Sequence, residues 1–241
     1  MRKFSLITVL MLMVSVTTKA QILISLLMGD KLNTGKIEFG LEGGFTLSSI
    51  QNLPDSKGLP TFNLGFYFDF KLKDPSWAIN TGVIVKSAMG AKDLPVYSLG
   101  DQHLDSVFVG GSISRRIDYF NVPVMIKYSF KNHIYVKGGF QLGLRYNAHD
   151  KFLNTVNDKN DLEYELKTKE QFSRFDAGLV AGLGYRFMKG NGMDVGVKYY
   201  YGLVDIYIDD VSANQFNRAF YVTACIPIGR GKVNKQAAEH K

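Results

Sequence analysis

The 241-residue chain contains little of several features that define common protein classes. Its single cysteine, Cys225, excludes an intramolecular disulfide and any metal site built from several thiolates. Beyond the N-terminal segment there is no apolar run of roughly 20 residues, so a transmembrane helix is not predicted there. A mean hydropathy of −0.05 likewise excludes a bundle of membrane helices. It does not exclude a membrane β-barrel, because alternating strands average to a hydropathy near zero.

A strong charge of one sign is also absent. The formal net charge is +7, but residues 1–20 contribute Arg2, Lys3 and Lys19 and no acid. The remaining chain has 26 basic and 22 acidic residues, a net charge of +4. Nucleic-acid-binding proteins usually concentrate basic residues on one face, and no such cluster occurs in this sequence. No nucleic-acid partner is expected.

The N-terminus has the pattern of a secretory signal peptide. Met1, Arg2 and Lys3 form a positive start, an apolar run follows, and Thr18 and Ala20 supply small residues before a cleavage site. We expect residues 1–20 to be removed and residues 21–35 to form a periplasmic segment. The mature protein would then function outside the cytoplasm.

Alternation of apolar and polar residues dominates the rest of the chain, and no segment sustains a helical period. This period of two predicts β-strands with one apolar face. Eight such runs are present: 37–47, 62–72, 77–86, 121–130, 134–145, 175–187, 194–201 and 219–228. Transmembrane strands need about 9–11 residues, whereas soluble strands are commonly about 5–6 residues long.

The connections between these runs alternate in length. Long connections are expected at 48–60, 89–116, 149–171 and 205–215, and short turns at 73–76, 131–133 and 188–192. Outer-membrane barrels have short periplasmic turns and long outer loops. The sequence therefore predicts an all-β fold, an eight-stranded antiparallel up-and-down transmembrane β-barrel over residues 36–229.

The two faces of the predicted strands differ in chemistry. One face is large, aromatic and nearly uncharged, which suits contact with lipid. The opposite face is rich in glycine, which suits the narrow lumen of an eight-stranded barrel. It also carries charges of both signs. The predicted lumen-lining charges are Glu42, Asp69, Lys86, Lys127, Lys137, Arg145, Asp176, Arg186 and Lys198.

Four segments together resemble one family. Residues 118–128 (DYFNVPVMIKY), 136–143 (VKGGFQLG), 175–185 (FDAGLVAGLGY) and 198–203 (KYYYGL) are similar to strands of the PorT-like outer membrane β-barrel proteins of Bacteroidetes. The resemblance implies a small outer-membrane barrel. Its name-giving member is tied to type IX secretion and gliding machinery, which implies envelope or secretion-machinery partners. The chain departs from a typical barrel at its end, where residues 230–241 form a basic tail without a terminal Phe.

The scattered histidines show no spacing typical of a metal or catalytic site. No enzyme activity, cofactor or metal is predicted. We expect a membrane scaffold or interaction protein, embedded in outer-membrane lipid with both termini periplasmic, that binds through loops at 89–116 and 149–171. Two alternatives stay open. One is a narrow transport pore with a water path past Lys127, Lys137 and Lys198. The other is a soluble lipocalin-like carrier with the apolar faces turned inward.

Overall fold

The computed structural model describes residues 35–155, 160–208 and 214–228. The predicted signal peptide, almost all of the predicted periplasmic segment 21–35 and the basic tail 230–241 lie outside these ranges. In the described part of the chain, no helix is both long enough and apolar enough to cross a membrane.

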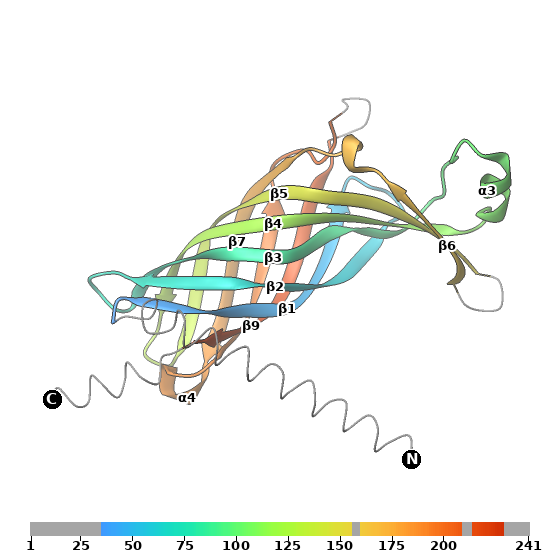
Figure 1. The fold of residues 1–241 in the computed structure, drawn as a ribbon. Helices are drawn as coiled ribbons and strands as arrows, with labels where there is room; N and C mark the ends of the chain where they lie inside the picture. The colour runs from blue at the N-terminus through green and yellow to red at the C-terminus, as the bar shows by residue number, and fades with distance from the viewer. Residues whose placement is uncertain (1–34, 156–159, 209–213, 229–241) are drawn as a thin grey trace, which may run out of the picture.

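Eight antiparallel strands form a closed ring, as the alternation predicted (Figure 1). The sheet order β4-β3-β2-β1-β9-β8-β7-β5 is closed by pairing between β4 and β5, and a ninth strand, β6, pairs only with β5 outside the ring. The strands are β1 (Ile37–Gln51), β2 (Lys57–Lys71), β3 (Trp77–Leu94), β4 (Ser112–Ser129), β5 (Ile134–Thr155), β6 (Asn160–Lys167), β7 (Phe175–Arg186), β8 (Asp194–Gly202) and β9 (Phe216–Pro227).

The connections divide the barrel into two different ends. At the short-turn end, β2–β3, β4–β5 and β7–β8 are joined by tight turns, the last containing α4 (Phe187–Gly190). The opposite, long-loop end carries the remaining connections, including α3 (Gln102–Val107) and η2 (Lys169–Gln171). In Figure 1, α3 and α4 lie at opposite ends of the molecule.

The predicted lengths of three connections were wrong. The first is only residues 52–56, because β1 and β2 extend well beyond the predicted runs. The third shrinks to residues 95–111 between the ends of β3 and β4. Residues 149–171 are mostly strand, since β6 folds back on the end of β5 and pairs His149 with Lys167. The extended ends of β3, β4 and β5 rise beyond the rest of the ring, and together with β6 they meet near α3 (Figure 1).

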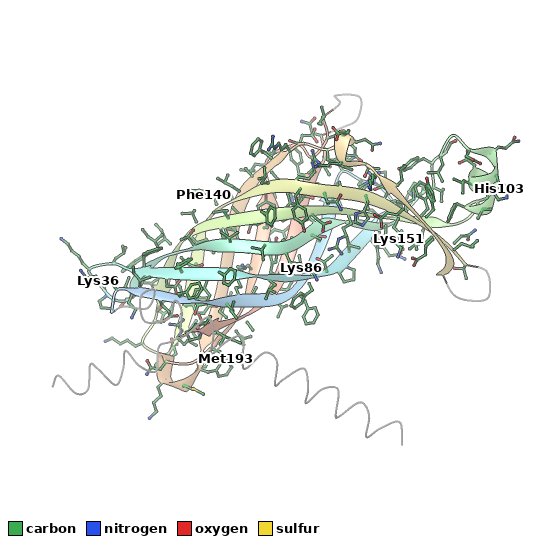
Figure 2. All side chains as sticks on the ribbon, viewed as in Figure 1. Lys36, Lys86, His103, Phe140, Lys151 and Met193 are labelled. Carbon is green, nitrogen blue, oxygen red and sulfur yellow. The ribbon has the colours of Figure 1, made fainter. Side chains whose placement is uncertain are left out.

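Large apolar side chains cover the outside of the barrel, which contradicts the inward orientation that a soluble carrier requires. Phe140 on β5 points away from the wall (Figure 2) and is 50% exposed. Near the short-turn end, Trp77 stacks on Tyr128 with ring centroids 4.7 Å apart. Near the other end, the ring centroids of Phe120 and Tyr146 lie 4.5 Å apart. Aromatic pairs at both margins of an apolar belt are typical of interfacial girdles.

Two facing glycines make room for a tyrosine inside the wall. Gly184 on β7 pairs with Gly196 on β8, and on its other side it pairs with Tyr135 on β5. A Cβ at either glycine would overlap the Tyr135 hydroxyl. Tyr135 is only 2% exposed, so its ring cannot shift to make room for a Cβ at either glycine without losing its own contacts.

We expect Gly184→Ala to destabilise the folded barrel by about 1–3 kcal/mol through overpacking against Tyr135. The matched control is Gly138→Ala, because Gly138 faces outward and its Cβ would meet no atom closer than 3.9 Å. Urea unfolding in lipid vesicles, followed by the fluorescence of the single tryptophan, Trp77, measures both. Equal effects of the two substitutions would contradict this packing argument.

Candidate functional site

The half of the barrel interior nearest the short-turn end contains a group of charged side chains. We call this group the interior charge cluster. Its members are Glu38, Glu42, Asp69, Lys127, Lys137, Arg186, Asp194 and Lys198. Four acids face four bases, so the cluster is formally neutral. Alternation along β1, β2, β4, β5, β7 and β8 turns all eight side chains to the same side of the wall.

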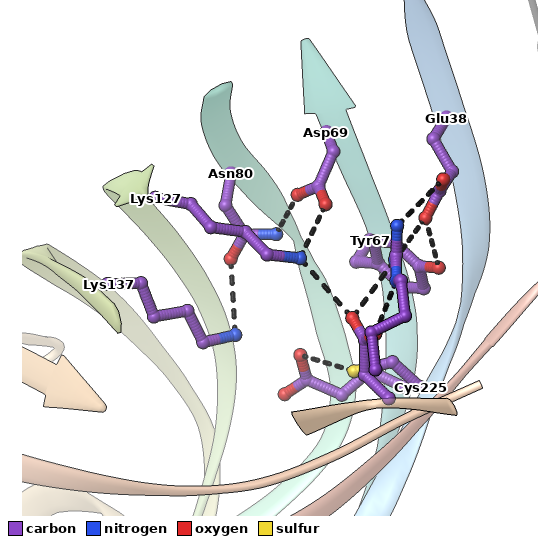
Figure 3. Close-up of polar contacts among 10 residues, drawn as sticks. Glu38, Tyr67, Asp69, Asn80, Lys127, Lys137 and Cys225 are labelled. Carbon is purple, nitrogen blue, oxygen red and sulfur yellow. Dashed lines mark hydrogen bonds and ion pairs between the residues drawn. The ribbon is translucent and has the colours of Figure 1, made fainter. Parts of the chain in front are cut away.

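Lys127 on β4 joins two acids from distant strands (Figure 3). Its Nζ lies 2.7 Å from Asp69 Oδ2 on β2 and 3.2 Å from Asp194 Oδ2 on β8. Its Nζ also lies 4.4 Å from the centroid of the Tyr135 ring. Asn80 Nδ2 donates to the other Asp69 oxygen at 2.5 Å. These contacts span the lumen from β2 to β8.

Arg186 at the end of β7 is the second bridging cation. Its Nε donates to Asp194 Oδ1 at 2.5 Å, and its terminal nitrogens reach both oxygens of Glu38 on β1. The Tyr67 hydroxyl donates to Glu38 Oε1 at 3.0 Å. Arginine suits this position because its planar fork binds carboxylates through paired hydrogen bonds.

Glu42 and Lys198 form a third, deeper pair. Lys198 Nζ donates to Glu42 Oε1. The Lys198 side chain is 1% exposed and the Glu42 side chain is 5% exposed. The Cys225 Sγ lies 3.7 Å from the other Glu42 oxygen. Lys137 Nζ donates to Asn80 Oδ1 at 3.3 Å, which links it to the Asp69–Lys127 pair (Figure 3). Burying so many charges is tolerable only because each meets an opposite charge or a hydrogen-bond partner.

Two predicted lumen charges lie apart from this cluster. Asp176 on β7 is buried and accepts a hydrogen bond of 2.8 Å from Asn217 Nδ2, which also donates to the Tyr119 hydroxyl. Arg145 on β5 is buried, and its Nε donates to the carbonyl of Ser173 at 3.1 Å. Both residues lie toward the long-loop end, near the start of β7.

The prediction that Lys86 lines the lumen was wrong. A β-bulge places Val85 and Lys86 opposite the single residue Phe120 of β4, between the pairs Ile84–Asn121 and Ser87–Tyr119. The extra residue shifts the alternation, so both side chains are exposed outside while Ile84 and Ser87 are buried. The Lys86 ammonium lies 6.0 Å from the ring of the outward-facing Phe62.

Two essential members of the cluster, Glu38 and Asp194, were missing from the predicted set. The signal for both was in the sequence. Glu38 has the same parity as Glu42, and Asp194 has the same parity as Lys198. They were overlooked because each lies at the end of a strand, where the alternating run has barely begun.

The other half of the interior contains a cluster of apolar side chains, which were not predicted, next to the polar group of Asp176 and Asn217. They include Met89, Ile113, Ile117, Ala148 and Phe172, all essentially inaccessible to solvent. A buried ion pair lies beyond them, next to the long connections. Arg115 Nε and Asp150 Oδ1 are 2.9 Å apart, and the Tyr97 hydroxyl donates to Asp150 at 3.1 Å. Arg115 also contacts the Tyr207 hydroxyl, so this pair joins β4 and β5 to two of the long connections.

A pocket of about 210 Å³ opens at the short-turn end near Pro75 and His133 and ends at Lys127 and Arg186. Within the described ranges no group of three or more His, Cys, Asp or Glu side chains is placed to hold a metal ion. The arrangement binds strands together through charge pairs, and we find no nucleophile–base pair in it.

We expect Lys198→Met to destabilise the barrel by about 3–5 kcal/mol, because it leaves the Glu42 carboxylate buried without its cation. The double variant E42Q/K198M should recover most of that loss. Lys86→Met, on the outer face, should change the unfolding free energy by less than about 0.5 kcal/mol. Urea titration in vesicles tests all three, and no recovery in the double variant would contradict the pairing.

Comparison with known proteins places this fold in a family. A family model described as "Outer membrane protein beta-barrel domain" matches residues 20–207, more than half of the chain. Comparison with curated proteins gives no match.

Several solved structures are similar in fold. The attachment invasion locus protein Ail of Yersinia pestis has a TM-score of 0.43 and 12% identity, over 80% of this chain and 99% of Ail. Neisserial surface protein A has a TM-score of 0.37 and 10% identity, over 80% and 96%. The N-terminal β-barrel domain of Pseudomonas aeruginosa OprF has a TM-score of 0.31 and 10% identity, over 78% and 98%. The assignment rests on the family match: the chain belongs to the outer membrane protein β-barrel domain family and is a small barrel of the Gram-negative outer membrane.

Proposed function

We propose that this protein is a non-enzymatic scaffold of the outer membrane that binds a protein partner through its long-loop end. The observation that carries the proposal is the contrast between the two ends of the barrel. One end has only tight turns, whereas the other carries strand extensions and a helix whose hydrophobic core is continuous with the barrel interior. Loops held on a rigid scaffold are where binding residues concentrate.

The core of this extension is built around Phe152 on β5, which is fully buried. Tyr97 and Phe108 from the β3–β4 connection and Tyr164 on β6 contact its ring, with centroids 5.1, 5.8 and 6.3 Å away. The Asn154 amide donates to the carbonyl of Val107 at 2.6 Å. These contacts fix α3 against the β5–β6 hairpin, so the end presents one shaped surface.

Local hydrogen bonds order the β3–β4 connection as well. The Asp101 side chain accepts from the amides of His103 and Leu104 and caps α3. The Ser98 hydroxyl and the Leu99 amide donate to Asp105, and these bonds lower the pKa of its carboxyl below the ordinary value. The connection therefore keeps a defined shape at neutral pH. A defined shape favours binding of a partner over enclosure of a solute.

The orientation of the barrel is part of the proposal. A secretory signal peptide delivers the chain from the periplasm, and β1 starts and β9 ends at the short-turn end. We infer that both termini lie in the periplasm and that α3 and the β5–β6 hairpin face outward. Short turns on the periplasmic side and long outer loops are the usual arrangement in outer-membrane barrels.

The finer assignment follows from the four segments that resemble PorT-like proteins. We propose that the chain is a PorT-like barrel of a Bacteroidetes outer membrane and that its partner belongs to the secretion or gliding machinery of the envelope. The resemblance supports this assignment, and the built surface at the long-loop end supplies a place for such a partner. No cofactor or metal is required.

We expect the barrel to carry no ions, which tests the proposal against the alternative of a narrow pore. The charge pairs of Lys127 and Lys198 cross one half of the lumen, and a cluster of apolar side chains packs in the other half. In planar bilayers the full-length protein should give no conductance steps at any applied voltage, with a porin as the positive control. Reproducible steps would favour transport.

We expect a photo-crosslinking amino acid at Val109, in the β3–β4 connection, to capture one discrete envelope protein in living cells. Val109 is 75% exposed at the long-loop end. The matched control is Met188, which is 79% exposed at the short-turn end and should not give the same adduct. Absence of an adduct at Val109, or identical adducts at both positions, would count against a partner at this end.

A further inference from the structure

A pocket on the outer wall of the barrel combines lipid-facing rings with basic side chains. It has a volume of about 460 Å³ and is lined by Phe120, Leu144, Arg145, Tyr146, Lys169, Glu170 and Arg174. Phe120, Leu144 and Tyr146 belong to the exposed apolar surface of β4 and β5. The charged residues other than Arg145 come from the connection between β6 and β7. One wall is therefore continuous with the apolar belt, and the other is polar.

The polar wall is fixed in place by main-chain hydrogen bonds. The amide of Arg145 donates to the carbonyl of Arg174 at 2.9 Å, and Arg145 Nε donates to the carbonyl of Ser173. The amide of Thr168 donates to the carbonyl of Ala148 at 3.1 Å. The connection is thus tied to β5 on both sides of the pocket, and the pocket exists without a ligand.

The charges of the lining favour an anion. Arg145, Lys169 and Arg174 outnumber the single acid, Glu170. Among the described residues none of these three bases forms an ion pair. Lys169 and Arg174 are exposed and supply the positive charge that a ligand in the pocket can reach. Arg145 is only 9% exposed and its Nη1 is fully buried, so it adds positive charge behind the pocket without contacting a ligand there.

We propose that this pocket binds the phosphorylated headgroup of a lipid in the leaflet at the long-loop end. The apolar wall lies where acyl chains pack, and the bases lie at its margin beside the Phe120–Tyr146 pair. Arginine binds phosphate through paired charge-assisted hydrogen bonds, and basic pockets beside a membrane-embedded surface recognise anionic headgroups. A protein or a soluble anion would not use the apolar wall. The site is separate from the surface proposed to bind a protein partner. The choice of lipid A as its ligand rests on the proposed orientation, in which the long-loop end faces outward.

The test measures binding of bis-phosphorylated lipid A to the full-length protein in mixed micelles. Lys169→Glu combined with Arg174→Glu should weaken binding about tenfold or more, because two charge-assisted contacts are lost. The control, Lys73→Glu with Lys131→Glu, makes the same charge change on two exposed residues of short-turn connections and should bind like the wild type. Lipid A without its phosphates should bind the wild type about tenfold more weakly.

A heat-dependent shift on SDS gels shows that each variant is folded. If the charge-reversal variant does not fold, the milder pair Lys169→Gln with Arg174→Gln replaces it. Three results would overturn the proposal. These are wild-type affinity in the pocket variant, equal affinity for the lipid without phosphates, and competition by inorganic pyrophosphate at the same concentration as the lipid. The last result would identify a site for soluble anions.

Discussion

Closure of the sheet into a ring of eight strands is the constraint on which the rest of this structure depends. It gives each of the eight ring strands two hydrogen-bonded neighbours, as a lipid environment requires, and it leaves a lumen only wide enough for side chains. Polar residues that alternation turns inward therefore meet across the axis. Lys127 on β4 reaches Asp194 on β8, and Arg186 on β7 reaches Glu38 on β1. The charges are neutral as a set, and they tie β1, β2, β4, β7 and β8 to strands that are not their neighbours.

Alternation in the sequence carries most of this arrangement. A period of two predicts the strand type, the eight-strand closure and the side of the wall that Glu42, Lys127 and Lys198 occupy. It says nothing about which acid meets which base, because that depends on strand tilt and register. It also fails at a bulge: one extra residue beside Phe120 sends Lys86 outward, and no residue type in the run Val83–Lys86 marks the change.

The long-loop end was harder to predict for a different reason. Where the strands rise beyond the rest of the ring, β3 is buried at consecutive positions, as at Ala88 and Met89, and the alternation disappears. The β5–β6 hairpin has a polar sequence because one of its faces is exposed, so its strands look like a charged loop. The pairing of His149 with Lys167 can be seen only once the register is known. The segments proposed to bind a partner were thus predicted in the correct place but with the wrong structure.

The division of the interior also supports the proposal that the protein acts through its outer surface. Buried charge pairs cross one half of the lumen, and a cluster of apolar side chains packs in the other half beside buried polar residues such as Asn63, Gln141 and Asn217. Such an interior makes the wall rigid, and a rigid wall reduces the entropy lost when a surface built on it binds. Arg115 and Asp150 transmit that rigidity beyond the ring, because they tie β4 and β5 to the connections that carry Tyr97 and Tyr207. In the proposed function, the charged core serves to fix the surface that binds the partner.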